Sequence, residues 1–171
     1  GRNDDLLCVR YLLKQGYLLP SSIDEDKLIS DTVDKLIKND DMLFLTIYPT
    51  EACNFRCKYC PESTTPVYME TQTAEKLLLF LESVLPKYKR LIIAWFGGEP
   101  LFNVAAIDTI CEGLHRGGVA LRSTMISNGY LFDDEIINRA VGQWNLKSVQ
   151  ITLDGTEKIY NKVKAFIYKE C

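Results

Sequence analysis

Histidine, phosphate-binding loops and long apolar runs are scarce or missing in this sequence of 171 residues. The single histidine, His115, falls late in a predicted helix beside Arg116, which favours a solvated helix-end residue over a metal ligand or a base, and no Ser–His–Asp triad can be assembled. No Gly-x4-Gly-Lys loop occurs, which argues against a P-loop nucleotide enzyme. No apolar run approaches the length that spans a bilayer, and no secretory leader is visible. The net charge of −3 gives no reason to expect nucleic acid or a membrane surface as a partner.

Cysteines are too few for a disulfide scaffold in a chain of this length, since there are six. They fit a reducing compartment, so we expect a cytoplasmic protein. Three of them, Cys53, Cys57 and Cys60, lie within eight residues and can reach one metal centre. The remaining three, Cys8, Cys111 and Cys171, are expected to be free thiols, with Cys111 on the apolar face of a helix.

The spacing of the three close cysteines differs from that of a zinc site built from two Cys-x2-Cys pairs, because no second pair is present. Three thiolates leave one iron of a 4Fe–4S cube without a protein ligand, whereas electron-transfer clusters usually have four. The open iron is a position where a substrate or cofactor can bind. A cysteine cluster that binds zinc, or nothing, is the alternative.

Strand and helix patterns alternate four times after the first 41 residues. Helices are predicted from about Thr73 to Leu85, from a cap at Asn103 to Gly117, and after a cap at Asp133. Trp95 and Trp144 are interpreted as packing residues. Such alternation predicts one parallel sheet, in sequence order, with helices on its outer face. The predicted strands are Met42–Tyr48, Arg90–Phe96, Val119–Ser127 and Leu146–Leu153.

Residues 1–41 are expected to form an N-terminal helical extension. Leucines near the start suggest a short helix that ends at Gly16. Ser22 and Glu25 have the spacing of a capping box, which predicts a second helix to about Lys38. The chain begins at Gly1 rather than Met and ends at Cys171 without a turn or cap, so we expect a piece of a longer protein.

Chemically distinctive segments follow each predicted strand. The cysteine loop follows the first strand, and Gly97-Gly98-Glu99-Pro100 follows the second. Ser127-Asn128-Gly129 comes after the third, and Thr152-Leu153-Asp154-Gly155 closes the fourth. Because active sites of β/α barrels lie at the C-terminal ends of the strands, the four loops are expected to converge on one rim. Turn geometry alone is the alternative explanation for each glycine-containing segment.

The loop Cys53-Asn54-Phe55-Arg56-Cys57-Lys58-Tyr59-Cys60 resembles that of the radical S-adenosylmethionine (SAM) enzymes, whose Cys-x3-Cys-x-aromatic-Cys pattern it matches in full. The resemblance covers roughly residues 42–164. It implies a (β/α)6 barrel of which only the first four β/α units are present, so that residues 42–171 are the N-terminal part of a truncated barrel. The last strands and any auxiliary-cluster domain would be absent.

The resemblance also implies cofactors and site residues. Cys53, Cys57 and Cys60 would hold a 4Fe–4S cluster. The residues expected to contact SAM are Tyr59 near the adenine, Gly97, Gly98, Glu99 and Pro100 near the methionyl amino group, and Ser127, Asn128, Thr152 and Asp154 near the ribose or the methionyl carboxylate. The catalytic acid or base is not identified.

The segment Leu153-Asp154-Gly155-x4-Tyr160-Asn161 resembles the subgroup that modifies peptides and sulfatases and often carries C-terminal auxiliary Fe–S clusters of the SPASM or twitch kind. That subgroup commonly has a His-Asn or His-Asp pair followed by Arg, where this chain has Tyr160 and Lys164. Lys164 keeps the charge but lacks the bidentate fork of arginine, so a carboxylate-clamp role does not carry over.

The implied function is reductive cleavage of SAM to a 5′-deoxyadenosyl radical, which abstracts hydrogen from a substrate, here a peptide or protein. A flavodoxin- or ferredoxin-type protein would supply the electron. An iron–sulfur electron carrier and an inactive peptide-binding module are the alternatives. A barrel cut after its fourth strand would expose a strand edge, so self-association or the rest of a longer chain is expected to cover it.

Overall fold

The computed structural model describes residues 2–37, 41–62 and 65–165. The chain divides into two compact units, Gly1–Asp40 and Asp41–Cys171. None of the described helices is long and apolar enough to cross a membrane.

The first unit contains two helices, α1 (Arg2–Lys14) and α2 (Glu25–Ile37). Gly16, with φ of +77°, follows α1 in the left-handed region that favours glycine, as the predicted helix end requires. The cap of α2 differs from the prediction: the Asp24 Oδ1 accepts from the backbone N–H of Lys27 at 3.0 Å, so Asp24 rather than Ser22 satisfies the first turn. The predicted end at Lys38 lies outside the described residues.

The second unit is built on a four-stranded parallel sheet in the order β1-β2-β3-β4, which confirms the predicted fold class and strand order. Each strand is one or two residues shorter than predicted. The strands are β1 (Met42–Ile47), β2 (Arg90–Trp95), β3 (Leu121–Ser127) and β4 (Leu146–Ile151).

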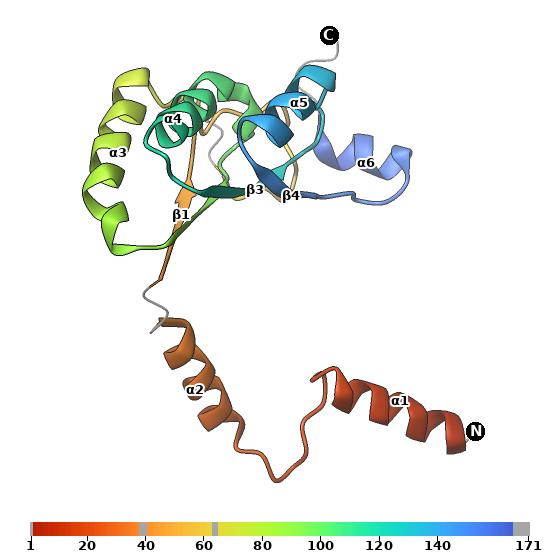
Figure 1. Cartoon of the computed structure of the whole chain (residues 1–171). Coiled ribbons are helices and arrows are strands. Elements are labelled where there is room, and N and C mark those ends of the chain that lie inside the picture. Colours follow the sequence, from red (N-terminus) through yellow and green to blue (C-terminus); the bar gives the residue numbers. More distant parts are fainter. Residues whose placement is uncertain (1, 38–40, 63–64, 166–171) are drawn as a thin grey trace. The chain divides into compact units, whose positions relative to one another are not determined.

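Helices α3 (Thr71–Val84), α4 (Val104–Arg116) and α5 (Asp134–Gly142) stand in a row along one face of the sheet (Figure 1). Both predicted caps are confirmed, since the Asn103 side chain accepts from the Ala106 N–H and Asp133 from the Ile136 N–H. Short 3-10 turns, Leu85–Lys87 and Pro100–Asn103, complete the connections. An eight-residue helix that the sequence reading missed, α6 (Glu157–Lys164), follows β4.

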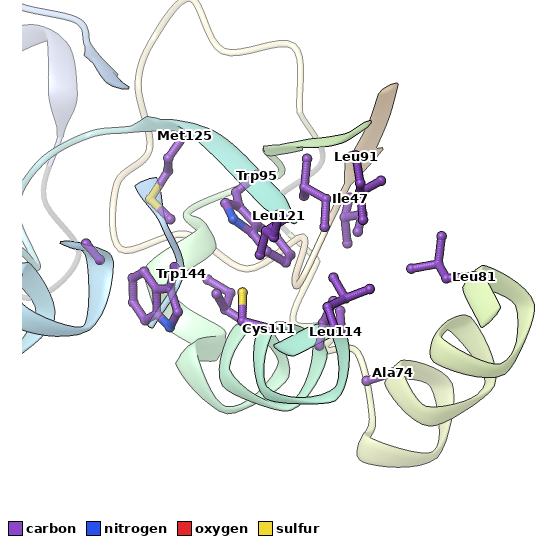
Figure 2. Close-up of a cluster of buried hydrophobic side chains, with 14 of the residues drawn as sticks. Ile47, Ala74, Leu81, Leu91, Trp95, Cys111, Leu114, Leu121, Met125 and Trp144 are labelled. Carbon is purple, nitrogen blue, oxygen red and sulfur yellow. The ribbon is translucent and has the colours of Figure 1, made fainter. Parts of the chain in front are cut away.

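The hydrophobic core lies between the sheet and this row of helices. Alternate residues of β2 and β3 point into it, including Leu91, Trp95 and Met125, and meet Cys111 and Leu114 of α4 (Figure 2). Burial of each large side chain of this kind contributes roughly 1.5–3 kcal/mol. Trp95, Trp144 and Cys111 are fully buried, as expected of packing residues.

The opposite face of the sheet is open. A hollow of about 470 Å³ lies on it, formed by apolar and polar side chains that alternate with the core-facing ones. Its lining includes Phe44, Thr46, Phe96, Thr124, Ile126 and Gln150. In a closed barrel this face would be the interior.

Candidate functional site

The C-terminal ends of the four strands meet at one edge of the sheet because the strands pair closely in register. Ile47 lies opposite Trp95, Trp95 opposite Met125, and Ser127 opposite Ile151. The loops that follow the strands therefore start side by side. This is the arrangement that the sequence predicted for the rim.

Gly97 and Gly98 lie directly against the start of the cysteine loop. A Cβ atom at Gly98 would come within 2.4 Å of the carbonyl oxygens of Glu51 and Ala52, and one at Gly97 within 2.3 Å of the Thr50 oxygen. Gly97 also has φ of +121°. The Gly98 N–H donates to the Thr50 oxygen at 3.1 Å, and the Glu99 N–H to the Ala52 oxygen at 2.9 Å. The two glycines thus allow close contact between the segment after β2 and the backbone of Thr50–Ala52, and this contact fixes the position of Cys53 relative to the sheet.

The Glu99 side chain has no exposed surface and links the segment after β2 to the segment after β3. Its Oε1 accepts from the Ser127 hydroxyl at 2.9 Å and the Leu101 N–H at 3.2 Å, and its Oε2 from the Asn128 N–H at 2.8 Å. Burial raises the pKa of the Glu99 carboxyl, while the hydrogen bonds from Asn128, Leu101 and Ser127 oppose the rise. Three of the roughly four acceptor positions of the carboxylate are taken by the protein itself.

Cys53 sits at the foot of the cysteine loop, half buried. Its Sγ accepts from the Phe55 N–H at 3.4 Å and lies 3.9 Å from the Asn128 Nδ2. Burial raises the pKa of the Cys53 thiol, and the neighbouring Glu99 and cysteine charges raise it further, whereas the Phe55 N–H lowers it. The thiol therefore keeps its proton at neutral pH until a metal replaces it.

Phe55 anchors the middle of the loop. Its side chain is 1% exposed and packs edge-on against the rings of Tyr130, after β3, and Tyr160, in α6. The loop is thereby held between two segments that are far apart in sequence.

The second half of the cysteine loop is fastened to the end of α6. The Arg56 N–H donates to the carbonyl oxygens of Lys164 and Ala165 at 3.1 and 3.0 Å, and the Lys58 N–H to that of Val163 at 3.1 Å. These main-chain bonds join positions more than 100 residues apart. Cys57 is half buried beside them, and Cys60 is exposed.

Lys164 is the charged centre of this second contact. Its side chain is only 3% exposed, and its Nζ lies 3.1 Å from the Asp154 Oδ2 and donates to the Tyr59 hydroxyl at 2.7 Å. The hydroxyl donates in turn to Asp154 at 3.1 Å. Burial lowers the pKa of Lys164, but the bonds to Tyr59 and Asp154 outweigh it and raise the pKa above its usual value.

The Lys164 cation also acts on Cys57. Burial raises the pKa of the Cys57 thiol, and the nearby ammonium opposes this rise. A positive charge at this position favours the thiolate that a metal requires.

The residues fit an iron–sulfur cluster. Within the described ranges, no three His, Cys, Asp or Glu side chains converge on a point that could hold one metal ion. A 4Fe–4S cube does not need such convergence, because each cysteine binds a different iron at a different corner. Asn54 adds a compatible observation: its Nδ2 is buried without a hydrogen-bond partner among the described residues, and a cluster sulfide would be a suitable acceptor for it.

The predicted site residues fall into two groups. Gly97, Gly98, Glu99, Ser127 and Asn128 gather around Cys53, whereas Tyr59 and Asp154 gather around Lys164 beside Cys57. Pro100 is buried at the start of its 3-10 turn. Thr152 lies exposed one residue beyond β4 and joins neither group.

The sequence did not predict that Asn54 belongs to the site or that Lys164 is buried. Asn54 offered no signal beyond its place next to Cys53. Tyr160 and Lys164 are spaced four residues apart, which places both on one face of a helix and was the available signal for α6.

Comparison with known proteins identifies the family of the chain that carries this site. Residues 47–168 match the radical SAM superfamily. The radical SAM cyclopropyl synthase TigE of Paramaledivibacter caminithermalis is 23% identical over 168 residues, covering 81% of this chain and 35% of that protein. The GTP 3′,8-cyclase of Microcystis aeruginosa is 28% identical over 122 residues, covering 67% of this chain and 35% of that protein.

A solved structure shares the fold. It is native anSMEcpe with bound AdoMet and Cp18Cys peptide, with a TM-score of 0.61 and 21% identity over 74% of this chain and 35% of that one. The chain therefore spans about a third of the length of the relatives it matches. Enzymes of this family use a 4Fe–4S cluster and SAM. With 122 consecutive residues matching its pattern, the chain belongs to the radical SAM superfamily.

Proposed function

We propose that the protein to which this chain belongs cleaves SAM reductively and uses the resulting radical to modify a peptide or protein. The observation that carries the proposal is the position of the three-cysteine loop. It lies at the C-terminal edge of the parallel sheet, in direct contact with the Gly97–Pro100 and Ser127–Asn128 segments and with Asp154 through Tyr59. A simple electron carrier has no need for these surroundings.

Each residue has a role in this proposal. Cys53, Cys57 and Cys60 hold the 4Fe–4S cluster, which together with SAM supplies a 5′-deoxyadenosyl radical. Gly97, Gly98 and Glu99 fix the position of the cysteine loop relative to the sheet and orient the methionyl end of SAM. Ser127, Asn128, Thr152 and Asp154 border the space for the nucleoside, with Tyr59 beside the adenine. The protein contributes position and exclusion of water.

A peptide is the proposed substrate, with a flavodoxin- or ferredoxin-type reductant in the cytoplasm. Two features support it: the Leu153-Asp154-Gly155-x4-Tyr160-Asn161 segment of the peptide-modifying subgroup, and the peptide bound in the anSMEcpe structure, whose fold this chain shares. GTP is the second candidate, because the relative from Microcystis aeruginosa is a GTP cyclase.

The test is anaerobic reconstitution of the full-length protein with iron and sulfide, followed by reduction with dithionite and addition of SAM. Formation of 5′-deoxyadenosine supports the enzyme. A reducible cluster that yields none would point to an electron carrier, and failure to take up iron to a binding module. The Cys53→Ala, Cys57→Ala and Cys60→Ala variants should lose the cluster, whereas Cys111→Ala should keep it.

The two candidate substrates are then distinguished by adding either a peptide pool or GTP to the reconstituted enzyme. We expect a peptide pool to stimulate 5′-deoxyadenosine formation and to yield a peptide of altered mass. Stimulation by GTP alone would replace the peptide in the proposal and leave the cofactor chemistry intact.

A further inference from the structure

Asn128 follows β3, and its side-chain amide is held at both ends. The Asn128 Oδ1 accepts from the Tyr130 N–H at 2.9 Å, which fixes which end of the amide carries the protons. The Nδ2 donates to the Asn54 Oδ1 at 2.6 Å and lies 3.9 Å from the Cys53 Sγ. Both protons of the amide are therefore directed at the foot of the cysteine loop.

The backbone at Asn128 is fixed as well. Its N–H donates to the buried Glu99 carboxylate, and the same carboxylate accepts from the Ser127 hydroxyl. A continuous hydrogen-bonded path thus runs from Glu99 after β2, through Asn128 after β3, to Cys53 after β1.

Metal binding changes the hydrogen bonds that the Cys53 sulfur can form. In the metal-free protein the Cys53 thiol can donate to the Asn54 Oδ1, 3.8 Å away. As a ligand the sulfur is a thiolate, so it has no proton to donate and becomes a stronger acceptor. The side-chain amide of Asn128 has two protons; one goes to the Asn54 Oδ1, and the second then has the Cys53 thiolate, 3.9 Å from the Nδ2, as its favourable acceptor.

We propose that Asn128 is a positioning residue for the cluster, which donates an N–H···S hydrogen bond to the Cys53 ligand and thereby favours the reduced state. This rests on the proposed function, and it gives Asn128 a role toward the cluster in addition to any contact with SAM. Reduction adds one electron, whose charge is shared with the sulfur ligands, so a donor at Cys53 stabilises the reduced form more than the oxidised form.

The experiment compares the reconstituted full-length protein with its Asn128→Asp and Asn128→Ala variants, without SAM. Iron per chain is measured first, and the cluster is then titrated with dithionite and followed by electron paramagnetic resonance. At the potential where half of the parent cluster is reduced, we expect the ratio of reduced to oxidised cluster to fall about tenfold in Asn128→Asp, which is about 59 mV for one electron. Asn128→Ala, which removes the donor without adding charge, should lower the ratio about threefold.

Asn138→Asp is the matched control, because Asn138 is exposed on α5 and the same charge is added away from the site. Its ratio should equal that of the parent. A folded Asn128 variant that retains less iron would support the contact with Cys53. Unchanged ratios of reduced to oxidised cluster in both Asn128 variants would overturn the proposal. It would also be overturned if both variants failed to fold without metal, because Asn128 would then have a structural role only. A parent protein that takes up no cluster would instead refute the proposed function.

Discussion

The two halves of the cysteine loop are supported in different ways. The Cys53 half rests on backbone contacts with Gly97–Glu99 and on a buried network of Glu99 and Asn128, all fixed to the ends of central strands. The Cys57 half is tied to the end of α6, a helix of two turns that is attached through Lys164, three main-chain bonds and the ring contact of Tyr160 with Phe55. The first support belongs to the sheet and the second is added to it. A change in the backbone contacts of Gly97 and Gly98 should therefore lower the free energy of unfolding and metal binding together, and a change at the end of α6 should lower the free energy of unfolding less.

The largest effect is expected from Gly98→Ala. The added methyl group would meet backbone oxygens that cannot move without displacing Cys53, so the free energy of unfolding of the metal-free protein should fall by about 3 kcal/mol. Denaturant titration followed by circular dichroism measures this, and iron uptake should be lost as well. Gly142→Ala is the control, since nothing lies within 4 Å of a Cβ there. Equal stability of the two variants would contradict the proposed support of Cys53.

Replacing Lys164 tests the second half. Lys164→Met leaves the Asp154 carboxylate and the Tyr59 hydroxyl without their buried partner, which should lower the free energy of unfolding by about 2 kcal/mol. The ion pair between Lys89 and Asp41 provides the comparison, because it is as short, at 2.8 Å, but 77% and 49% exposed. Lys89→Met should change stability by less than about 0.5 kcal/mol. A similar loss in both would show that burial of Lys164 contributes nothing.

A replacement at Ala165, at the same end of α6, is expected to raise the free energy of unfolding instead of lowering it. Ala165 has φ of +46°, in the left-handed region, while its carbonyl accepts from the Arg56 N–H. Ala165→Gly removes the steric cost of this conformation and should stabilise the protein by up to about 1 kcal/mol. In exposed Ala105 of α4, the same replacement should destabilise by about 1 kcal/mol. Destabilisation at both positions would contradict the strain inferred at Ala165.

The smallest expected difference is in thiol reactivity. In the metal-free protein at pH 8, exposed Cys60 should be alkylated by iodoacetamide several-fold faster than Cys53 or Cys57, because burial raises the pKa of these two thiols and lowers the thiolate fraction. Cys111 should be the slowest, since burial raises the pKa of its thiol to about 12. Peptide mapping by mass spectrometry gives the order. Faster labelling of Cys53 than of Cys60 would mean that the Cys53 half is the looser one.

The sequence was sufficient for the sheet and for the grouping of loops at its edge. Apolar strands separated by helices with local caps at Asn103 and Asp133 are short-range patterns, and parallel connectivity then follows from the alternation. The cysteine spacing is equally local. These features require no knowledge of contacts between distant residues.

The features that could not be predicted from the sequence depend on contacts between residues that are far apart along the chain. Lys164 meets Tyr59 across 105 residues, and its burial is a property of that meeting. The pattern of α6 spans only two turns, too short for reliable periodicity, and α6 was missed for that reason. The Gly97–Gly98 pair was predicted to admit a ligand, but the structure shows that both glycines also admit the chain's own backbone at Thr50–Ala52. A close approach of two loops leaves no trace in either segment alone.

Both tryptophans are buried in the second unit, Trp95 on β2 and Trp144 between α5 and β4, and the sequence contains no others. Tryptophan fluorescence, excited at wavelengths that tyrosine does not absorb, will therefore report on the sheet and its helices alone, with emission at the short wavelengths typical of indoles shielded from water. The two helices of residues 2–37 contribute no tryptophan, so their unfolding is silent in this signal and visible in far-ultraviolet circular dichroism. A difference between the two transitions would measure directly how independently the two units fold.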